Sequence, residues 1–404
     1  MISLRTQKSR LTTPNMDTSL EVTDKKIQIT NTSNGKLESG WPQRLYSLDA
    51  LRGFDMFWII GAEDIFHGLA KATGSPFWAS ISIQFTHPLW NGFHVYDLIF
   101  PLFLFLAGVS TPYSVGRDLE KGKSRPELML RVIKRGLILV LLGIIYNNGL
   151  ELRPLADIRF SSVLGRIGIA YMLANIIYLY TKERTQIIWF AGLLIGYWLI
   201  LKFTSAPGFA AGDLTMEGNF ASYVDRTILP GKLSLGIHDT VGFFNNIPAI
   251  STALAGIIVG SFLRKGLMTP LQKAMGLAIA GIVCLVLGQL WNLDFPINKN
   301  MWSSSFVLHT TGLSLILLSV FFYIIDVRGY KNWAFFFKVI GMNSILIYIS
   351  GKFINWTYTT NAFFKWLGQL VGDPYNIVVM AICMLAIKWL ILYVLYKKRV
   401  FLRV

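Results

Sequence analysis

Long apolar runs, separated by short polar segments, occupy most of the 404 residues of this chain. Each run is about 20 residues long, the length of a helix that crosses the hydrocarbon core of a bilayer. We therefore expect an all-α, polytopic membrane bundle of about ten transmembrane helices (ten to eleven). The predicted spans centre near residues 57, 105, 139, 171, 195, 256, 281, 314, 342 and 386.

Two segments depart from this apolar pattern. Residues 1–42 are polar and lack periodicity, which predicts a disordered cytoplasmic tail. Residues 43–404 then form one transmembrane domain, since no soluble domain and no internal repeat interrupts the spans. The segment 352–375 is rich in aromatic residues and is typical of a helix at the membrane interface, with an eleventh span as the alternative.

Basic residues gather in alternate loops between the spans. The chain has 38 Lys and Arg residues against 22 Asp and Glu residues, which gives a formal charge of +16. The positive-inside rule places both termini in the cytoplasm and the 66–94, 205–245 and 293–302 loops outside, in a bacterial inner membrane. Because the charges follow this topology, we expect membrane lipids as neighbours and no nucleic-acid partner.

Cysteine and histidine patterns give no indication of a metal site. The two cysteines, Cys284 and Cys383, fall inside apolar runs, which is typical of buried side chains and excludes a disulfide framework. His87 and His94 lie seven residues apart, but they lack the clustered Cys or carboxylate ligands of a metal centre. We expect no metal, and we interpret the other histidines, including His238, as structural.

The clearest candidate site is the segment 85–101, where a polar outer loop runs into an apolar helix. The segment contains His87, Trp90, Asn91 and Asp97. Histidine can both take and give a proton near neutral pH, because its unperturbed pKa lies closest to that range. This combination predicts proton-transfer chemistry at the mouth of a site in the membrane.

Charged residues inside the first span point toward the same site. Asp49 and Arg52 are three residues apart and are expected to pair along one helix face. On a continuous helix Glu63 would lie about 16 Å beyond Arg52, within reach of the loop that carries His87. Intramembrane charges usually face the bundle interior, so a purely structural role for Asp49 and Arg52 is an equal alternative.

Several longer patterns occur in order along the chain and together resemble those of one known family. They are RLYSLDALRG at 44–53, HPLWNG at 87–92 followed by DLIFP at 97–101, VLGRIG at 163–168, FPINKNMWSSSF at 295–306 and GMNSI at 341–345. These segments are similar to motifs of the heparan-α-glucosaminide N-acetyltransferases. Two positions depart from the family pattern, since Gly165 replaces a glutamine and Glu63 replaces the asparagine of the animal enzymes.

The resemblance implies acetyl transfer across the membrane, from cytosolic acetyl-CoA as donor substrate to the amine of a terminal glucosamine. Heparan sulfate and a bacterial amino sugar both stay open as the acceptor. The family's catalytic histidine corresponds to His87, as general base or as transient acetyl carrier. Glu63 would act as a base or would orient His87. Asn91, or a backbone N–H near Gly92, would donate to the oxyanion of the tetrahedral intermediate.

The remaining candidates are binding residues. Asp97 is expected to assist catalysis, to fix the loop or to pair with Lys299. The candidates for contact with the acceptor sugar are Trp90, Asn298, Lys299 and Trp302. The candidates for contact with CoA, at the cytoplasmic side, are Arg52, Arg135, Arg166 and Asn343. Arginine suits bidentate phosphate binding, but ordinary positive-inside charges and interfacial tryptophan anchors are open alternatives. For Asn298 and Lys299 the alternative is that they only shape the Pro-bounded outer loop.

Transport is the competing function. A ten-helix bundle with charges near its midplane also suits proton-coupled uptake of an amino sugar without acetyl transfer. A transferase would release CoA-SH, whereas a transporter would accumulate its substrate without acetyl-CoA. The sequence contains none of the patterns typical of ATP binding, serine hydrolysis or zinc hydrolysis. A homodimer is compatible with the sequence, which specifies no oligomeric state.

Overall fold

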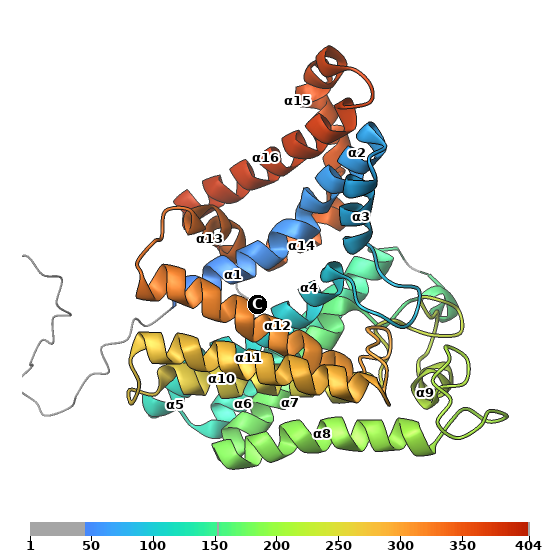
Figure 1. Ribbon diagram of the computed structural model, residues 1–404, viewed down its shortest axis with the longest axis vertical. Coiled ribbons are helices and arrows are strands. Elements are labelled where there is room, and N and C mark those ends of the chain that lie inside the picture. The colour runs from blue at the N-terminus through green and yellow to red at the C-terminus, as the bar shows by residue number, and fades with distance from the viewer. Residues whose placement is uncertain (1–44, 152, 403–404) are drawn as a thin grey trace, which may run out of the picture. The chain divides into compact units, whose positions relative to one another are not determined.

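The computed structural model describes residues 45–151 and 153–402, which form the predicted all-α fold (Figure 1). Within these residues no sheet forms, and β pairing is limited to an isolated bridge between Arg159 and Gly231. The predicted tail over residues 1–42 lies outside the described residues. The α-helices are α1 (Tyr46–Phe57), α2 (Glu63–Thr73), α3 (Pro76–Gln84), α4 (Ile99–Thr111), α5 (Arg117–Glu120), α6 (Arg125–Asn148), α7 (Val163–Tyr180), α8 (Glu183–Phe203), α9 (Phe220–Ile228), α10 (Asn246–Arg264), α11 (Pro270–Asn292), α12 (Ser304–Phe322), α13 (Ala334–Met342), α14 (Ser344–Phe353), α15 (Trp356–Val371) and α16 (Asn376–Lys397). Short 3-10 or π-helical segments are η1 (Trp58–Ala62), η2 (Val95–Leu98), η3 (Pro112–Gly116), η4 (Leu155–Asp157) and η5 (Tyr323–Val327).

Seven helical segments of the described chain are long and apolar enough to cross a membrane, or eight when the bent pair α13 and α14 counts as one span. These segments correspond to eight of the ten predicted positions. The other two positions, near residues 57 and 139, fall on α1–α2 and on α6. The charged residues of α1–α2, and Arg131, Lys134 and Arg135 in α6, explain why these helices do not meet the same criterion. The chain is a polytopic helical membrane protein.

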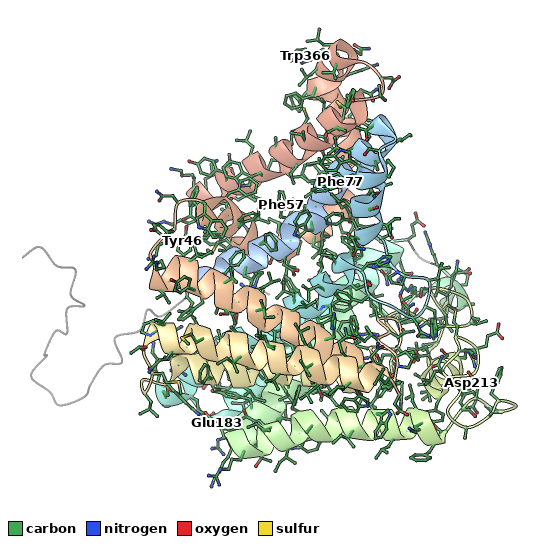
Figure 2. The ribbon with its side chains drawn as sticks, viewed as in Figure 1. Tyr46, Phe57, Phe77, Glu183, Asp213 and Trp366 are labelled. Carbon is green, nitrogen blue, oxygen red and sulfur yellow. The ribbon has the colours of Figure 1, made fainter. Side chains whose placement is uncertain are left out.

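The loops group at opposite ends of the bundle. At one end Arg264 donates to Glu120, and Lys265 contacts Glu183 at the start of α8. At the other end the 86–98, 205–245 and 293–303 segments pack together, and we call them the loop layer. Figure 2 shows Glu183 and Asp213 at these opposite ends. The predicted 205–245 and 293–302 loops thus meet the last part of the predicted 66–94 loop, while most of residues 66–84 lie in α2 and α3 instead of a loop. The side of the membrane that the loop layer faces stays a prediction.

Glycines permit the closest contacts between α4 and α10. A Cβ atom on Gly108 would lie 2.2 Å from the Ala253 carbonyl oxygen, and one on Gly256 would lie 2.0 Å from the Phe105 carbonyl oxygen. Lipid chains provide no hydrophobic force between helices, so small residues that allow such close packing stabilise a membrane bundle. This contact fixes α4, which directly follows the turn that carries Asp97.

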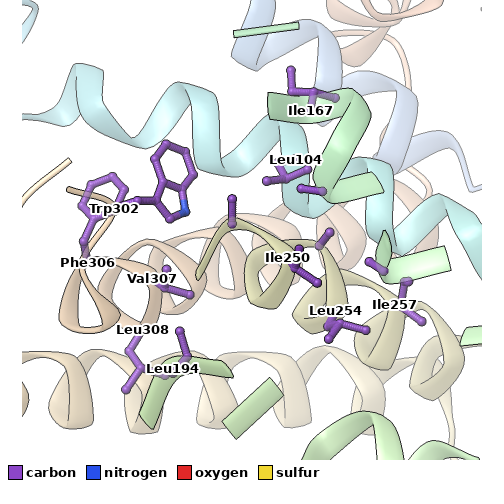
Figure 3. Packing of buried hydrophobic residues seen from close by; sticks show 14 of the residues in the cluster. Leu104, Ile167, Leu194, Ile250, Leu254, Ile257, Trp302, Phe306, Val307 and Leu308 are labelled. Atoms are coloured by element: carbon purple, nitrogen blue, oxygen red, sulfur yellow. The ribbon is translucent and has the colours of Figure 1, made fainter. Parts of the chain in front are cut away.

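One buried apolar cluster joins α4, α7, α10 and α12 (Figure 3). Leu104, Ile167, Ile250 and Phe306 come from these four helices. Trp302, from the loop that precedes α12, inserts into the same cluster and is fully buried. The cluster therefore anchors the loop that also carries the candidate residues before Trp302.

The first predicted span is broken in the middle rather than continuous. Gly61, in the π-helical segment η1, has φ +126°, and this conformation separates α1 from α2. Left-handed backbone of this kind favours glycine, because a Cβ atom would be strained there. Glu63 thus begins a new helix, and the expectation that it continues the face of Arg52 is wrong.

The predicted aromatic helix near 352–375 is present as α15. It exposes Tyr358, Phe363 and Trp366, with 73%, 66% and 62% of their surfaces accessible, and Trp366 is labelled in Figure 2. Aromatic side chains of this kind are enriched at membrane–water boundaries. Its location at the interface stays a prediction.

Candidate active site

His87 and Asp97 form the centre of the candidate site. The Nδ1 atom of His87 donates to Oδ1 of Asp97 at 2.7 Å. The carboxylate is fully buried, whereas the His87 side chain is 48% exposed. A carboxylate bonded to one ring nitrogen fixes the tautomer and the orientation of the ring. The second nitrogen, Nε2, then carries the lone pair that can accept a proton.

The 3-10 turn η2 places Asp97 beside the histidine. The backbone N–H of His94 donates to Oδ2 of Asp97 at 3.0 Å in a capping box at the start of this turn. The His94 ring in turn hydrogen-bonds the backbone carbonyl of Thr86 through Nδ1, at 3.0 Å. These two contacts close the loop around His87. The sequence did not indicate this positioning role of His94.

Lys299 faces the same histidine from the loop before α12. Its Nζ atom lies 2.9 Å from Nε2 and 3.1 Å from Nδ1 of His87, and 3.3 Å from Oδ1 of Asp97. Burial lowers the pKa of Lys299 to about 8, and the neighbouring Asp97 carboxylate opposes part of that effect. The structure therefore brings together a base, its orienting carboxylate and an amine from loops about 200 residues apart in sequence.

Two further contacts hold these loops together. The amide NH2 of Asn298 donates to Oδ1 of Asn91 at 3.0 Å, and the backbone N–H of Gly92 donates to the Ile297 carbonyl at 2.9 Å. Because the first contact uses the Asn91 oxygen as acceptor, the NH2 group of Asn91 is left to donate to another group. The second contact uses the Gly92 N–H, so that group is not available to an oxyanion.

Asn298 and Trp302 are located differently from what a sugar-binding role requires. Asn298 is fully buried, and its Oδ1 atom accepts the backbone N–H of Met301 at 2.8 Å. Trp302 is 0% exposed, and its indole N–H donates to Thr252 at 3.2 Å. A side chain without exposed surface offers no face to a sugar ring. We therefore correct both predictions: in this structure these residues organise the loop.

Trp90 lies at the edge of the site and is partly buried. Its indole N–H donates to the Leu214 carbonyl at 2.9 Å. Its ring meets the ring of His238 edge-on, with 5.1 Å between the centroids. These contacts fix the indole in the loop layer, and its remaining exposed surface leaves it as a candidate for contact with a sugar.

Tyr96 connects Glu63 to His87. The phenol of Tyr96 hydrogen-bonds the Glu63 carboxylate. The Tyr96 ring lies 5.1 Å, centroid to centroid, from the ring of His87. Glu63 thus approaches the His87 loop, as predicted, but through a tyrosine that sequence reasoning missed. A lone tyrosine at the start of an apolar run gave no signal.

Lys388 is a second residue that the prediction missed. It lies in α16, is 8% exposed and donates to the Ile60 carbonyl at 2.7 Å, at the break between α1 and α2. It is also close enough to Glu63 and Asp64 to interact with both electrostatically. A single lysine inside the last apolar run is the kind of intramembrane charge that indicates a functional or structural contact, so this signal was available.

Three of the four candidates for CoA contact lie apart from His87. Arg52 donates to Ser110 at 2.9 Å, and Arg135 donates to Tyr171 at 3.3 Å. Asn343 binds the C-terminal segment, because its side chain donates to the Val400 carbonyl and accepts the backbone N–H of Leu402. These contacts attach the three residues to different partners, so their common role in CoA binding stays a prediction. A structural role for Asn343 is evident.

Arg166 does not lie where it was predicted. Its guanidinium packs on the Trp302 ring, at 4.7 Å from the centroid, and donates to the Thr240 carbonyl at 3.4 Å. Both partners belong to the loop layer. The reason is that Arg166 lies in the first turn of α7, directly after the segment that Arg159 attaches to Asp239 at 3.0 Å. The expectation that Arg166 lies at the same end of the bundle as Arg52 is therefore wrong, while the side of the membrane that each end faces stays a prediction.

Two cavities are defined away from the His87 loop. One, of about 860 Å³, has mainly apolar walls from α8, α10, α11 and α12. The other, of about 520 Å³, lies between α2, α15 and α16 and includes Asp64, His67 and Lys71 in its lining. Among the described residues no group of three or more His, Cys, Asp or Glu side chains is arranged to hold a metal ion. The candidate site is thus identified by its side-chain geometry rather than by a cavity.

Comparison with a family model covers the segment that carries His87 and Asp97, whereas the loop that carries Lys299 lies beyond the matched residues. The family model described as heparan-alpha-glucosaminide N-acetyltransferase, catalytic, matches residues 44–290, which include His87 and Asp97. The human heparan-alpha-glucosaminide N-acetyltransferase is 27% identical over 424 residues, covering 91% of this chain and 61% of the human protein. The mouse protein of the same name is 28% identical over 408 residues, covering 84% of this chain and 60% of its own length.

The match is extensive on this chain but partial on its relatives. This chain spans about 60% of the length of both curated proteins. The family model nevertheless covers well over half of the 404 residues. The chain therefore belongs to the heparan-α-glucosaminide N-acetyltransferase catalytic family.

Proposed function

We propose that this protein transfers an acetyl group from acetyl-CoA to the amine of a terminal glucosamine or a related amino sugar. The loop layer then faces the acceptor, on the side of the membrane opposite to the CoA supply. The observation that carries the proposal is the 2.7 Å hydrogen bond between His87 and the buried Asp97, within the segment that matches the family. This arrangement is what a general base for acyl transfer needs.

The chemistry follows from the tautomer that Asp97 selects. With Nδ1–H donating to the carboxylate, Nε2 of His87 removes a proton from the acceptor amine as the amine attacks the thioester carbonyl. Asp97 then stabilises the imidazolium that forms, because a buried anion interacts strongly with a neighbouring positive charge. His87 returns the proton to the leaving thiolate, and CoA-SH is released. An acetyl-histidine intermediate would use the same nitrogen.

The tetrahedral oxyanion needs a donor near Nε2. The NH2 group of Asn91 fills that role in this proposal, since Asn298 orients the amide and the Gly92 N–H is engaged elsewhere. Removal of one such donor costs roughly 3 kcal/mol of barrier in other acyl-transfer enzymes. Lys299 must move aside before the acceptor amine arrives, because its Nζ atom lies within 3.1 Å of both ring nitrogens and blocks the approach to Nε2.

The test is a direct assay of the purified, full-length chain in detergent. It is incubated with acetyl-CoA and a panel of amino sugars, and both CoA-SH and the acetylated sugar are measured. We expect product with the wild type and a loss of about 10³-fold or more with His87→Ala. His238→Asn is the matched control, a histidine variant in the same loop layer that keeps the His87–Asp97 contact.

The same assay separates transfer from transport. A transporter would move the sugar into proteoliposomes without releasing CoA-SH. Sugar accumulation in vesicles that contain no acetyl-CoA, together with no CoA-SH release in detergent, would replace the transferase proposal with the transporter. Activity that survives His87→Ala would remove His87 from the mechanism.

A further inference from the structure

An amine already lies within reach of the base that the acceptor amine has to meet. Nζ of Lys299 is 2.9 Å from Nε2 and 3.1 Å from Nδ1 of His87, close enough for proton transfer once Nζ moves in line with the Nε2 lone pair. The same Nζ lies 3.3 Å from the Asp97 carboxylate, so it belongs to the catalytic group rather than to a distant ion pair. The Lys299 side chain is 21% exposed and is therefore accessible from the loop layer.

We propose that Lys299 is an acetylation site of the protein itself, modified by the His87 centre when no amino sugar is bound. The inference rests on the proposed function, which supplies the acetyl thioester. The carbon–sulfur bond of the thioester breaks and a bond forms between the carbonyl carbon and Nζ. The amine proton passes to Nε2 of His87 and then to the thiolate. The products are N-acetyl-lysine at position 299 and CoA-SH.

The protonation state of Lys299 favours this reaction. Only a neutral amine attacks a thioester, and burial lowers the pKa of Lys299 to about 8. Roughly one tenth of the side chains then carry a neutral amine at pH 7, against fewer than one in a thousand for an ordinary lysine. The other feature that favours reaction is the neighbouring base, which an isolated surface lysine lacks.

Lys202 provides an internal comparison in the same protein. It lies at the end of α8 beside the loop layer, where it pairs with Asp294 and packs over Trp198. Both members of that pair are more than 40% exposed, and the partner of the Lys202 amine is a carboxylate rather than a histidine. Lys202 is thus exposed, but the base that it contacts is the weakly basic carboxylate of Asp294 rather than an imidazole.

Acetylation would also change the site. An acetylated Lys299 loses the positive charge that faces Asp97, and its acetyl group occupies the space in front of Nε2. The acceptor amine could then no longer reach His87. We therefore expect the modified chain to transfer acetyl groups to sugars more slowly. Self-acetylation would then occur when no acceptor is bound and would lower the activity of the enzyme.

The experiment is mass spectrometry of the digested, full-length protein after incubation with isotopically labelled acetyl-CoA. Without an amino sugar, we expect label on Lys299 at a level at least about tenfold above that on Lys202, reflecting the adjacent base. His87→Ala should reduce the label on Lys299 to the level on Lys202. In the wild type, saturation with an amino sugar that is turned over should suppress the label on Lys299, and this comparison needs no variant.

The outcomes separate the two proposals. A wild-type sample that acetylates an amino sugar but leaves Lys299 unlabelled overturns the self-acetylation and leaves the transferase intact. Equal label on Lys299 and Lys202, or label on Lys299 that His87→Ala does not reduce, shows chemical acetylation and also overturns it. If neither the sugar panel nor Lys299 is acetylated by a folded sample, both proposals fail together.

Discussion

Two histidines in the loop layer, His87 and His238, have opposite surroundings. His87 is half exposed, with a carboxylate on Nδ1 and the amine of Lys299 within 3.1 Å of both ring nitrogens. His238 is fully buried, with its Nδ1 atom 2.6 Å from the Ser222 hydroxyl and its Nε2 atom 3.3 Å from the Asn300 carbonyl. Both rings are firmly held, but only one has a nitrogen that a substrate can reach.

The difference shows what separates a base from a structural histidine. Burial lowers the pKa of His238 to about 4, so the ring stays neutral and its nitrogens remain committed to the protein. His87 instead has a buried anion behind it and open surface in front. A carboxylate partner combined with exposure, rather than the presence of histidine, therefore marks the candidate catalytic group.

The largest effect is expected when the carboxylate behind His87 is neutralised. Asp97→Asn keeps the shape of the side chain, but its amide can donate to Nδ1 and select the tautomer in which Nε2 carries a proton. Nε2 then cannot act as a base, and we expect kcat to fall by about 10³-fold in the acetyl-transfer assay. KM for the sugar should change little, since Asp97 is buried beneath the ring.

Asp239→Asn is the matched control for this prediction. Asp239 is adjacent to His238 in sequence, is equally buried and also accepts backbone N–H groups. Its loss should change the amount of folded protein but not kcat per folded molecule. An Asp97→Asn variant that keeps more than about a tenth of wild-type kcat would contradict the role of Asp97 as the orienting anion.

The second prediction concerns pH and the surroundings of His238. The pKa of His238 is about 4 in the folded protein, below the ordinary 6.5. Between these two pH values the unfolded chain binds more protons than the folded one, so the free energy of unfolding falls as the pH drops from 6.5 to 4. Burial raises the pKa of the nearby Asp225 from 3.8 to about 6, so stability falls there as pH rises. Each pKa shift changes the free energy of unfolding by roughly 3 kcal/mol across this pH range. Because the two changes have opposite signs, they nearly cancel in the wild type.

Two variants should separate these opposing contributions. Relative to the wild type, His238→Gln should be more stable at pH 4 than at pH 7, because Asp225 alone still titrates. Asp225→Asn should show the reverse slope. The midpoint of thermal unfolding in detergent, recorded across this pH range, measures both. Parallel curves for the two variants would show that neither group is buried in the way that the structure indicates.

The third prediction tests the ion pair beside His238. Asp239 is fully buried and its partner Arg159 is 28% exposed, with 3.0 Å between the charged atoms. Loss of one partner from a fully buried pair costs 3–5 kcal/mol, so we expect about 2 kcal/mol for Asp239→Asn in this partly exposed pair. Asp294→Asn, in the exposed pair with Lys202, should cost less than about 1 kcal/mol. Equal losses of unfolding free energy would contradict the difference in burial.

Much of the His87 site could be predicted from the sequence, because it depends on residues close together in the chain and on the order of the membrane spans. His87 and Asp97 lie within one short segment, and the alternation of basic loops placed Lys299 on the same side of the membrane. The contact between Asp97 and Lys299 at 3.3 Å agrees with one of the roles considered for that aspartate. The apolar runs likewise predicted the helices, since their length reports the thickness of a bilayer.

The features that sequence did not reveal depend on distant contacts. The break at Gly61 is held by Lys388, 328 residues after the carbonyl to which it donates. An indole such as that of Trp302 can stack on a sugar ring, which is why the sequence suggested this role. Whether the indole faces solvent or core depends on packing, and here Trp302 packs against the rings of Phe100 and Phe306. Arg166 was assigned to the wrong end, because its charge alone suggested phosphate binding.

The smallest expected effect sharpens the role of the contact behind His87. Tyr96→Phe keeps the ring beside the histidine but removes the hydroxyl that binds Glu63. One hydrogen bond to a side chain is worth about 1 kcal/mol, so we expect a fall in kcat of about fivefold, while Tyr358→Phe, on exposed α15, should change nothing. If Glu63 acts through this hydrogen bond, the double variant with Glu63→Gln should lose no more activity than Glu63→Gln alone. Additive losses would instead assign Glu63 a contact with the substrate that does not pass through Tyr96.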